Sequence, residues 1–100
     1  MGQTDFSSAY VEYKTVIKYD VYVGGRFSGR TTSIEEIMVV ISDTLSWLGC
    51  YIISSESAAV WTQQLTGYFE WTNHAVLYYA NGNDVIPIKI VRRFMRICAF

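Results

Sequence analysis

The longest regular alternation of polar and apolar residues covers residues 10–23. Its odd-numbered positions are apolar apart from Thr15, whereas its even-numbered positions carry the charged side chains. Successive side chains of a β-strand point to opposite faces of the sheet, so the pattern predicts one long strand with an apolar face and a mostly charged face. The other elements are expected to pair with this strand or to cover its odd face.

Two glycines follow this strand and predict a hairpin turn, because glycine tolerates positive φ. A second strand is expected over residues 27–32. A two-residue loop would place two arginines on the apolar face, so a three-residue loop over residues 24–26 is preferred. The preferred register makes four pairs: Tyr19 with Thr31, Asp20 with Arg30, Val21 with Gly29, and Val23 with Phe27.

A helix is predicted to follow this hairpin. Ser33 and Glu36 form an S-x-x-E capping box, which is typical of a helix N-terminus. Apolar residues then recur at helical spacing; they are Ile34, Ile37, Met38, Ile41, Leu45 and Leu48. Gly49 predicts the end of the helix. Its apolar face is expected to lie on the odd face of the opening strand.

The middle of the chain gives weaker patterns. Residues 50–53 are short, apolar and partly β-branched, and they predict a buried strand. Residues 56–66 predict a second helix, capped by Ser54 or Ser55, although a strand is the alternative. Gly67 is expected to end this element.

The last third of the chain predicts a second hairpin. A strand is expected within residues 68–79, followed by a turn at residues 81–84. Residues 86–90 alternate as a further strand, which Pro87 would confine to a sheet edge. From Lys89 onward the spacing indicates a terminal amphipathic helix. Its basic face would hold Lys89, Arg92, Arg93 and Arg96.

Together these elements predict an α+β fold in a single domain, residues 1–100. It comprises a mainly antiparallel sheet starting with a long β-hairpin, two helices packed on one face, and a C-terminal strand running into a short basic helix. No apolar run approaches the roughly 20 residues that span a bilayer, and no secretory signal is visible. Cys50 and Cys98 lack a CxxC spacing, which indicates two reduced thiols in a cytoplasmic protein, with a disulfide left open.

Catalytic signatures are missing from the sequence. It contains no Walker loop, GxGxxG, GxSxG or HExxH, and no Cys/His spacing typical of a metal site. The single histidine, His74, could meet Glu70 and Asp84 at a sheet end, but any chain of this length supplies such a trio by chance. We therefore predict that the protein is not an enzyme, with no catalytic residue, no metal ligand and no cofactor.

Charge is segregated along the chain, although the net charge is only −1. Between Arg30 and Lys89 there are six acids and no lysine or arginine, whereas the two ends hold all eight bases against three acids. The distribution of charge is therefore more informative about a partner than the net charge is.

The leading hypothesis is a small protein-binding module, an inhibitor or adaptor that occludes a partner surface. Phage or mobile-element inhibitors of host nucleoprotein complexes, such as anti-CRISPR proteins, are one such class. Apolar side chains on the outer face of the opening strand suit an interface, and the acidic middle could meet a basic nucleic-acid channel. The candidate residues are Tyr10, Val16, Tyr22, Glu35, Glu36, Asp43 and Glu56.

The first alternative is RNA or DNA binding by a basic and aromatic sheet face together with the C-terminal arginines. Its candidate residues are Lys14, Lys18, Arg30, Lys89, Arg92, Arg93 and Arg96. A sequence pI of about 5.7 argues against a dedicated nucleic-acid binder. A homodimer built on the outer sheet face is the second alternative, and no membrane partner is predicted.

Overall fold

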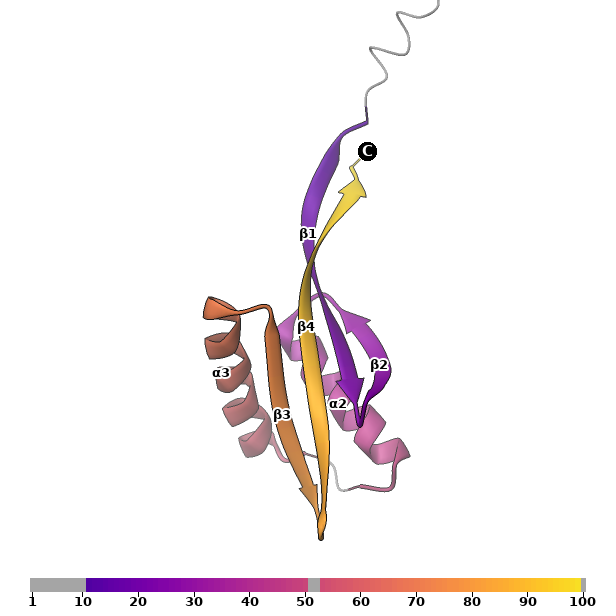
Figure 1. Ribbon diagram of the computed structural model, residues 1–100, viewed down its shortest axis with the longest axis vertical. Coiled ribbons are helices and arrows are strands. Elements are labelled where there is room, and N and C mark those ends of the chain that lie inside the picture. The colour runs from indigo at the N-terminus through magenta and orange to yellow at the C-terminus, as the bar shows by residue number, and fades with distance from the viewer. Residues whose placement is uncertain (1–10, 51–52, 100) are drawn as a thin grey trace, which may run out of the picture.

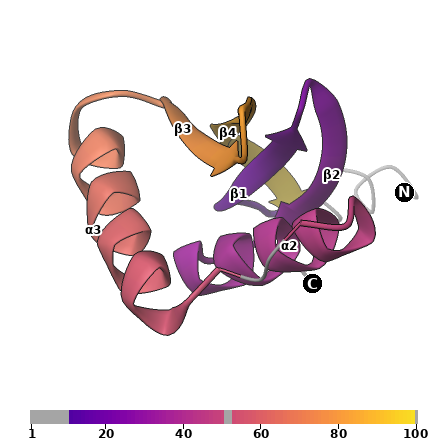
Figure 2. The ribbon, with the colours of Figure 1, turned by 90° about the horizontal axis from the view of Figure 1, so that it is seen from below.

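The computed structural model describes residues 11–50 and 53–99 of the protein. Within these residues four antiparallel strands form one sheet in the order β2-β1-β4-β3, and two helices pack on one of its faces (Figure 1, Figure 2). The elements are β1 (Tyr13–Val23), β2 (Arg26–Thr31), α2 (Ile34–Trp47), α3 (Ser55–Trp71), β3 (His74–Asn81) and β4 (Asp84–Cys98). The predicted α+β class is confirmed.

β1 is a central strand whose whole length pairs with β4, from Tyr13 opposite Cys98 to Val23 opposite Ile88. Its odd residues lie on the helix side of the sheet and its even residues on the other side. Val21 is fully buried and Val23 nearly so. The alternation seen in the sequence therefore does separate the core face from the outer face.

The β1–β2 hairpin differs from the predicted register at its turn. Three of the four predicted pairs are present, but Val23 lies opposite Arg26 instead of Phe27. The loop contains only the two glycines, which have φ of 60° and 83°, as two-residue hairpin loops require. A bulge leaves Ser28 unpaired, so that Phe27 pairs with Tyr22 and lies on the outer face.

α2 begins and ends where the sequence predicts. The Ser33 hydroxyl accepts a hydrogen bond from the backbone N–H of Glu36, and the Glu36 carboxylate accepts one from the backbone N–H of Thr32 at 2.8 Å. Gly49 follows the last turn with φ of 76°. The buried residues of α2 pack toward β1 and β2; they are Ile37, Met38, Ile41 and Leu45.

α3 is a helix, capped by the Ser54 hydroxyl, and it is longer than predicted. Gly67 does not end it, because Leu65 and Phe69 are one turn apart and both are buried in the core. Their burial offsets the cost of an internal glycine, which is about 1 kcal/mol relative to alanine. The strand expected within residues 68–79 consequently starts only at His74.

The C-terminal segment is one continuous strand, and the predicted basic helix is wrong. β4 pairs with β3 over its first half and with β1 over most of its length, so backbone pairing with two neighbours overrides the helical spacing. The edge position expected from Pro87 is wrong for the strand as a whole, because β4 lies between β1 and β3. Pro87 itself lies just past the end of β1, so that only β3 pairs with the strand at this residue. The short strand predicted over residues 50–53 includes residues 51–52, which lie outside the described residues.

β1 and β4 extend beyond the other elements as a two-stranded projection (Figure 1). We call residues 13–18 and 93–98 the arm, and the remaining described residues the body. β2 pairs with β1 no further than Tyr19, and β3 pairs with β4 no further than Val91. Within the described residues, every buried apolar side chain of the core belongs to the body.

Candidate binding surface on the open face of the sheet

The face of the sheet turned away from α2 and α3, which we call the open face, is built from rows of paired residues. Strand pairing brings side chains of neighbouring strands into each row. The rows are His74–Val91–Asp20–Arg30, Val76–Lys89–Tyr22–Phe27 and Tyr78–Pro87. A solvent-facing sheet usually alternates apolar side chains inward and polar ones outward, yet these rows contain many apolar side chains.

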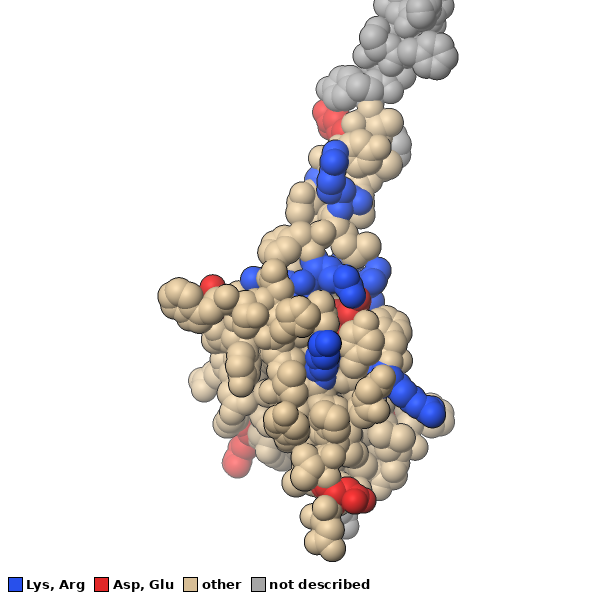
Figure 3. Space-filling model, viewed as in Figure 1, with Lys and Arg blue, Asp and Glu red and all other residues tan. Residues whose placement is uncertain are grey.

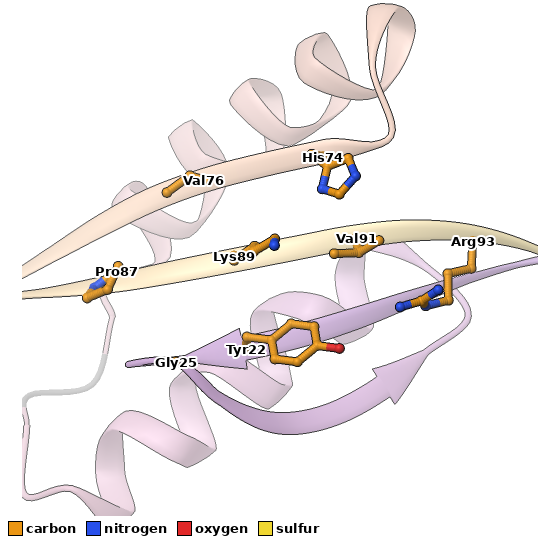
Figure 4. A pocket seen from close by; sticks show the side chains of 8 residues that line it. All are labelled: Tyr22, Gly25, His74, Val76, Pro87, Lys89, Val91 and Arg93. Carbon is orange, nitrogen blue, oxygen red and sulfur yellow. The ribbon is translucent and has the colours of Figure 1, made fainter.

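The open face is hollowed at its centre, with a volume of about 650 Å³ (Figure 4). Val76, Pro87 and Val91 supply apolar walls from β3 and β4. Lys89 lies among them, and the Tyr22 hydroxyl points along the sheet toward Arg93. The hollow therefore offers apolar contact area around one ammonium group.

Aromatic rings border this hollow. Tyr22 and Phe27 make an edge-to-face contact with ring centroids 5.6 Å apart, so the bulge in β2 gives Phe27 a partner on the open face. Phe27 is nevertheless 57% exposed, and Tyr78 is 66% exposed. Exposed rings beside exposed aliphatic side chains are typical of a surface that another molecule covers.

One buried carboxylate joins three strands on the open face. Asp20 is 2% exposed and accepts hydrogen bonds from Arg30 Nε at 2.6 Å and from Arg93 Nε. The hydrogen bond from Arg30 lowers the pKa of Asp20, and the one from Arg93 lowers it further, against an opposing effect of burial. The same contacts raise the pKa of both arginines. Asp20 therefore stays ionised and neutralises much of the charge of its neighbours.

Charge segregation along the sequence becomes segregation in space. All eight lysines and arginines lie in strands, whereas α2 and α3 hold five acids and no base. In Figure 3, which views the open face, basic groups gather on the arm and where the arm joins the body. The acids of the helices are Glu35, Glu36, Asp43, Glu56 and Glu70.

The residues predicted to bind a protein do not form one surface. Tyr22 borders the hollow, and Val16 lies on the same face of the arm opposite Met95. The acids Glu35, Glu36, Asp43 and Glu56 belong to the helices, on the other side of the sheet. Tyr10 lies outside the described residues. The structure thus separates an apolar and aromatic surface from an acidic one.

The residues predicted to bind nucleic acid lie closer together, mainly around the arm. Lys14, Lys18 and Arg93 are on its open side. Arg92 and Arg96 are on the opposite side, where each guanidinium stacks over a ring, Phe69 at 5.4 Å and Tyr13 at 4.6 Å respectively. Arg30 contacts the same carboxylate as Arg93, and Lys89 lies in the hollow.

Several residues of this surface were not predicted from the sequence. Val76 and Tyr78 have the opposite parity to Ala75 and Leu77, which are buried on β3. That parity is visible in the sequence once β3 is known to start at His74. The position of Phe27 depends on the bulge in β2, for which the sequence carries no comparable signal.

The possible meeting of His74, Glu70 and Asp84 at one sheet end does not occur. His74 pairs with Val91 at one end of β3, and Asp84 pairs with Asn81 at the other end. Among the described residues, no group of three His, Cys, Asp or Glu side chains could hold a metal ion. Cys50 and Cys98 are both free thiols.

Comparisons with known proteins gave no match to a family model, to a curated protein or to a solved structure. Neither α2 nor α3 is long and apolar enough to span a membrane. The chemistry of the open face is therefore the main guide to function.

Proposed function

We propose that the protein is a non-enzymatic protein-binding module, an inhibitor or adaptor, and that it occludes a partner with the open face of its sheet. The observation that carries this proposal is the set of exposed apolar side chains in and beside the central hollow, among them Phe27, Val76 and Tyr78. Rings and aliphatic groups of this kind form the cores of protein interfaces. Assignment to a phage or mobile-element inhibitor, such as an anti-CRISPR protein, stays a prediction.

The mixture of side chains favours a protein over a nucleic acid. Val76, Pro87 and Val91 offer aliphatic surface that suits apolar side chains, whereas single-stranded nucleic acids need stacking platforms and free cations. Asp20 already pairs with Arg30 and Arg93 on this face. The expected partner therefore presents an apolar centre and an acidic group placed for Lys89.

The acids of the helices belong to a separate surface. Glu35, Asp43 and Glu56 cannot share one flat interface with Tyr22, because the sheet lies between them. Their predicted role, to meet a basic nucleic-acid channel and steer association, would require a second contact of the same module. Reversing their charge is then expected to slow association without removing the contact made by the open face.

Capture of a partner from a lysate of the source cells, with and without nuclease, tests the proposal when matched variants are compared. Tyr78→Ser and Phe27→Ser remove exposed rings without opening the core, and each is expected to reduce capture at least tenfold, a loss of about 1.4 kcal/mol. Val60→Ser removes an exposed apolar group from α3 and is expected to leave capture unchanged. Undiminished capture by both open-face variants would contradict the proposal.

Nucleic-acid binding is a second candidate because the basic residues cluster around the arm. It predicts retention of a single-stranded oligonucleotide that falls steeply with salt concentration. Lys14→Glu/Lys18→Glu would then abolish retention, whereas Tyr78→Ser would weaken it far less. Absence of retention at low salt would remove this candidate.

A further inference from the structure

The side of the arm that continues the core face is exposed. Ile17 and Phe94 pair with each other there, next to the Tyr19–Arg92 pair at the end of the body, and Phe94 is 55% exposed. Arg96 stacks over Tyr13 on the same side. This side of the arm lacks the cover that α2 and α3 give the body. An isolated two-stranded ribbon is only marginally stable in water, so further cover would stabilise the arm.

The molecule consequently has a step on its helix side, where the helix layer stops and the arm continues (Figure 1). The step is one helix thick, about 10 Å. Six residues of a strand extend about 20 Å, and the fourteen residues of α2 extend about 21 Å. The arm is therefore long enough to lie along one helix of the dimensions of α2.

α2 carries a complementary ridge on the side opposite its buried residues. Glu35, Val39, Asp43 and Trp47 follow one another at intervals of four and form one exposed stripe. Val39 is 59% exposed and Trp47 is 90% exposed. Acidic and apolar groups alternate along this ridge.

We infer that two copies of the chain associate about a twofold axis, with the arm of each copy covering the α2 ridge of the other. Two stepped bodies in opposite orientation interlock, because the helix layer of each fills the step of its partner. Ile17 and Phe94 then meet apolar residues of the ridge, and Arg96 meets its acids.

A second copy is the occupant that the charges favour. On its helix side the arm carries Arg96 and no acid, whereas the exposed ridge of α2 carries Glu35 and Asp43 and no base, so each chain carries both halves of a complementary pair. The net charge of −1 leaves little repulsion between copies.

Two other modes of self-association fit the structure less well. Lys14 and Lys18 lie along the unpaired edge of β1, and lysines on an edge strand oppose addition of another strand. A twofold dimer built on the hollow of the open face would bring the Lys89 ammonium groups of the two copies together. In the interlocked dimer both open faces stay accessible.

Sedimentation equilibrium of the full chain over a range of concentrations tests this inference. Wild type is expected to dimerise, and Arg96→Glu is expected to raise the dimer dissociation constant at least tenfold. Combining Arg96→Glu with either Glu35→Lys or Asp43→Lys restores an opposite-charge pair across the contact. One of these two combinations is expected to recover a dissociation constant within about threefold of wild type.

The matched control is Lys89→Glu, which makes the same charge change on the open face and is expected to leave dimerisation unchanged. A wild-type monomer at all concentrations overturns the inference. The inference is also overturned if Lys89→Glu weakens the dimer and Arg96→Glu does not. It is overturned as well if neither double variant recovers the wild-type dissociation constant. Unfolding midpoints of the variants, measured at concentrations below the wild-type dissociation constant, show whether the body stays folded.

The inference is independent of partner binding by the open face. Tyr78→Ser is expected to lose the captured partner and keep the dimer, whereas Arg96→Glu is expected to lose the dimer and keep the captured partner. Failure of one proposal therefore leaves the other intact.

Discussion

The body and the arm contain the same two strands in different surroundings. Val21 and Ile90 pair in the body and are fully buried beneath the helices, whereas Ile17 and Phe94, four residues along on the same face, are exposed. The eleven residues of β1 extend about 36 Å, well beyond the roughly 21 Å of α2. Strand pairing continues through both regions, so a core arises only where the helices cover the sheet.

The largest expected effect on the free energy of unfolding is that of Ile90→Ala, a substitution in the body. Ile90→Ala leaves a cavity between the sheet and the helices, because this side chain is fully buried. The free energy of unfolding is expected to fall by about 2–5 kcal/mol. Urea denaturation monitored by tryptophan fluorescence measures it, and a loss below 1 kcal/mol would show that the body is not packed as described.

Within the covered half of the sheet, the sequence predicts well the two faces of β1 and the limits of α2. A strand with one buried face alternates apolar and polar residues, and residues 19–23 of β1 follow this pattern. The capping box and Gly49 predict where α2 begins and ends. The even face of β1 was correctly identified as the outer face. These features depend on local patterns, which a single sequence contains.

The β4 half of the arm is predicted wrongly because it has no buried face, whereas its β1 half was predicted as part of the long opening strand. Apolar residues on both sides of β4, among them Val91, Phe94 and Met95, remove the alternation, and the spacing of the bases then imitates a helix. Pairing with a strand some eighty residues away determines the structure instead, and this contact leaves no local signal. The bulge that moves Phe27 to the open face is likewise a property of the pairing.

A second expected effect concerns Asp20, which lies in the body next to the base of the arm. Asp20→Asn leaves Arg30 and Arg93 without their carboxylate and places an amide in a buried position. Because both arginines are partly exposed, the free energy of unfolding is expected to fall only moderately, by about 1.5–3 kcal/mol. Urea denaturation at pH 7 measures it, and an unchanged midpoint would contradict a stabilising role for this cluster.

The same cluster gives a pH dependence of defined sign. The pKa of Asp20 is lowered in the folded state, so the unfolded chain binds its proton at a higher pH than the folded chain does. The contribution of Asp20 to the free energy of unfolding is therefore complete above its usual pKa of 3.8. This contribution is lost as the pH falls through the lower pKa of the folded state. The stability difference between wild type and Asp20→Asn is expected to shrink below pH 4 and to be constant between pH 6 and pH 8.

A smaller effect is expected at the cap of α2, the helix that covers β1 and β2. Ser33→Ala removes the hydroxyl that accepts a hydrogen bond from the Glu36 N–H, at an expected cost of about 1 kcal/mol. Ser46→Ala, at an exposed position of the same helix, is the control and is expected to cost nothing. Equal effects of both substitutions would mean that capping does not stabilise the helix layer.

The smallest effect is expected at Phe94, the counterpart of Ile90 in the arm. In a dilute solution Phe94→Ala loses mainly its contact with Arg92, whose guanidinium lies 5.3 Å from the ring, so the cost should stay below about 1 kcal/mol. If a second copy covers the arm, the cost rises with protein concentration, because association stabilises only the wild-type chain. The Ile90→Ala difference, by contrast, depends less on concentration. A Phe94→Ala cost above 2 kcal/mol in dilute solution would show that the arm is covered within a single chain, and the distinction between body and arm would then fail.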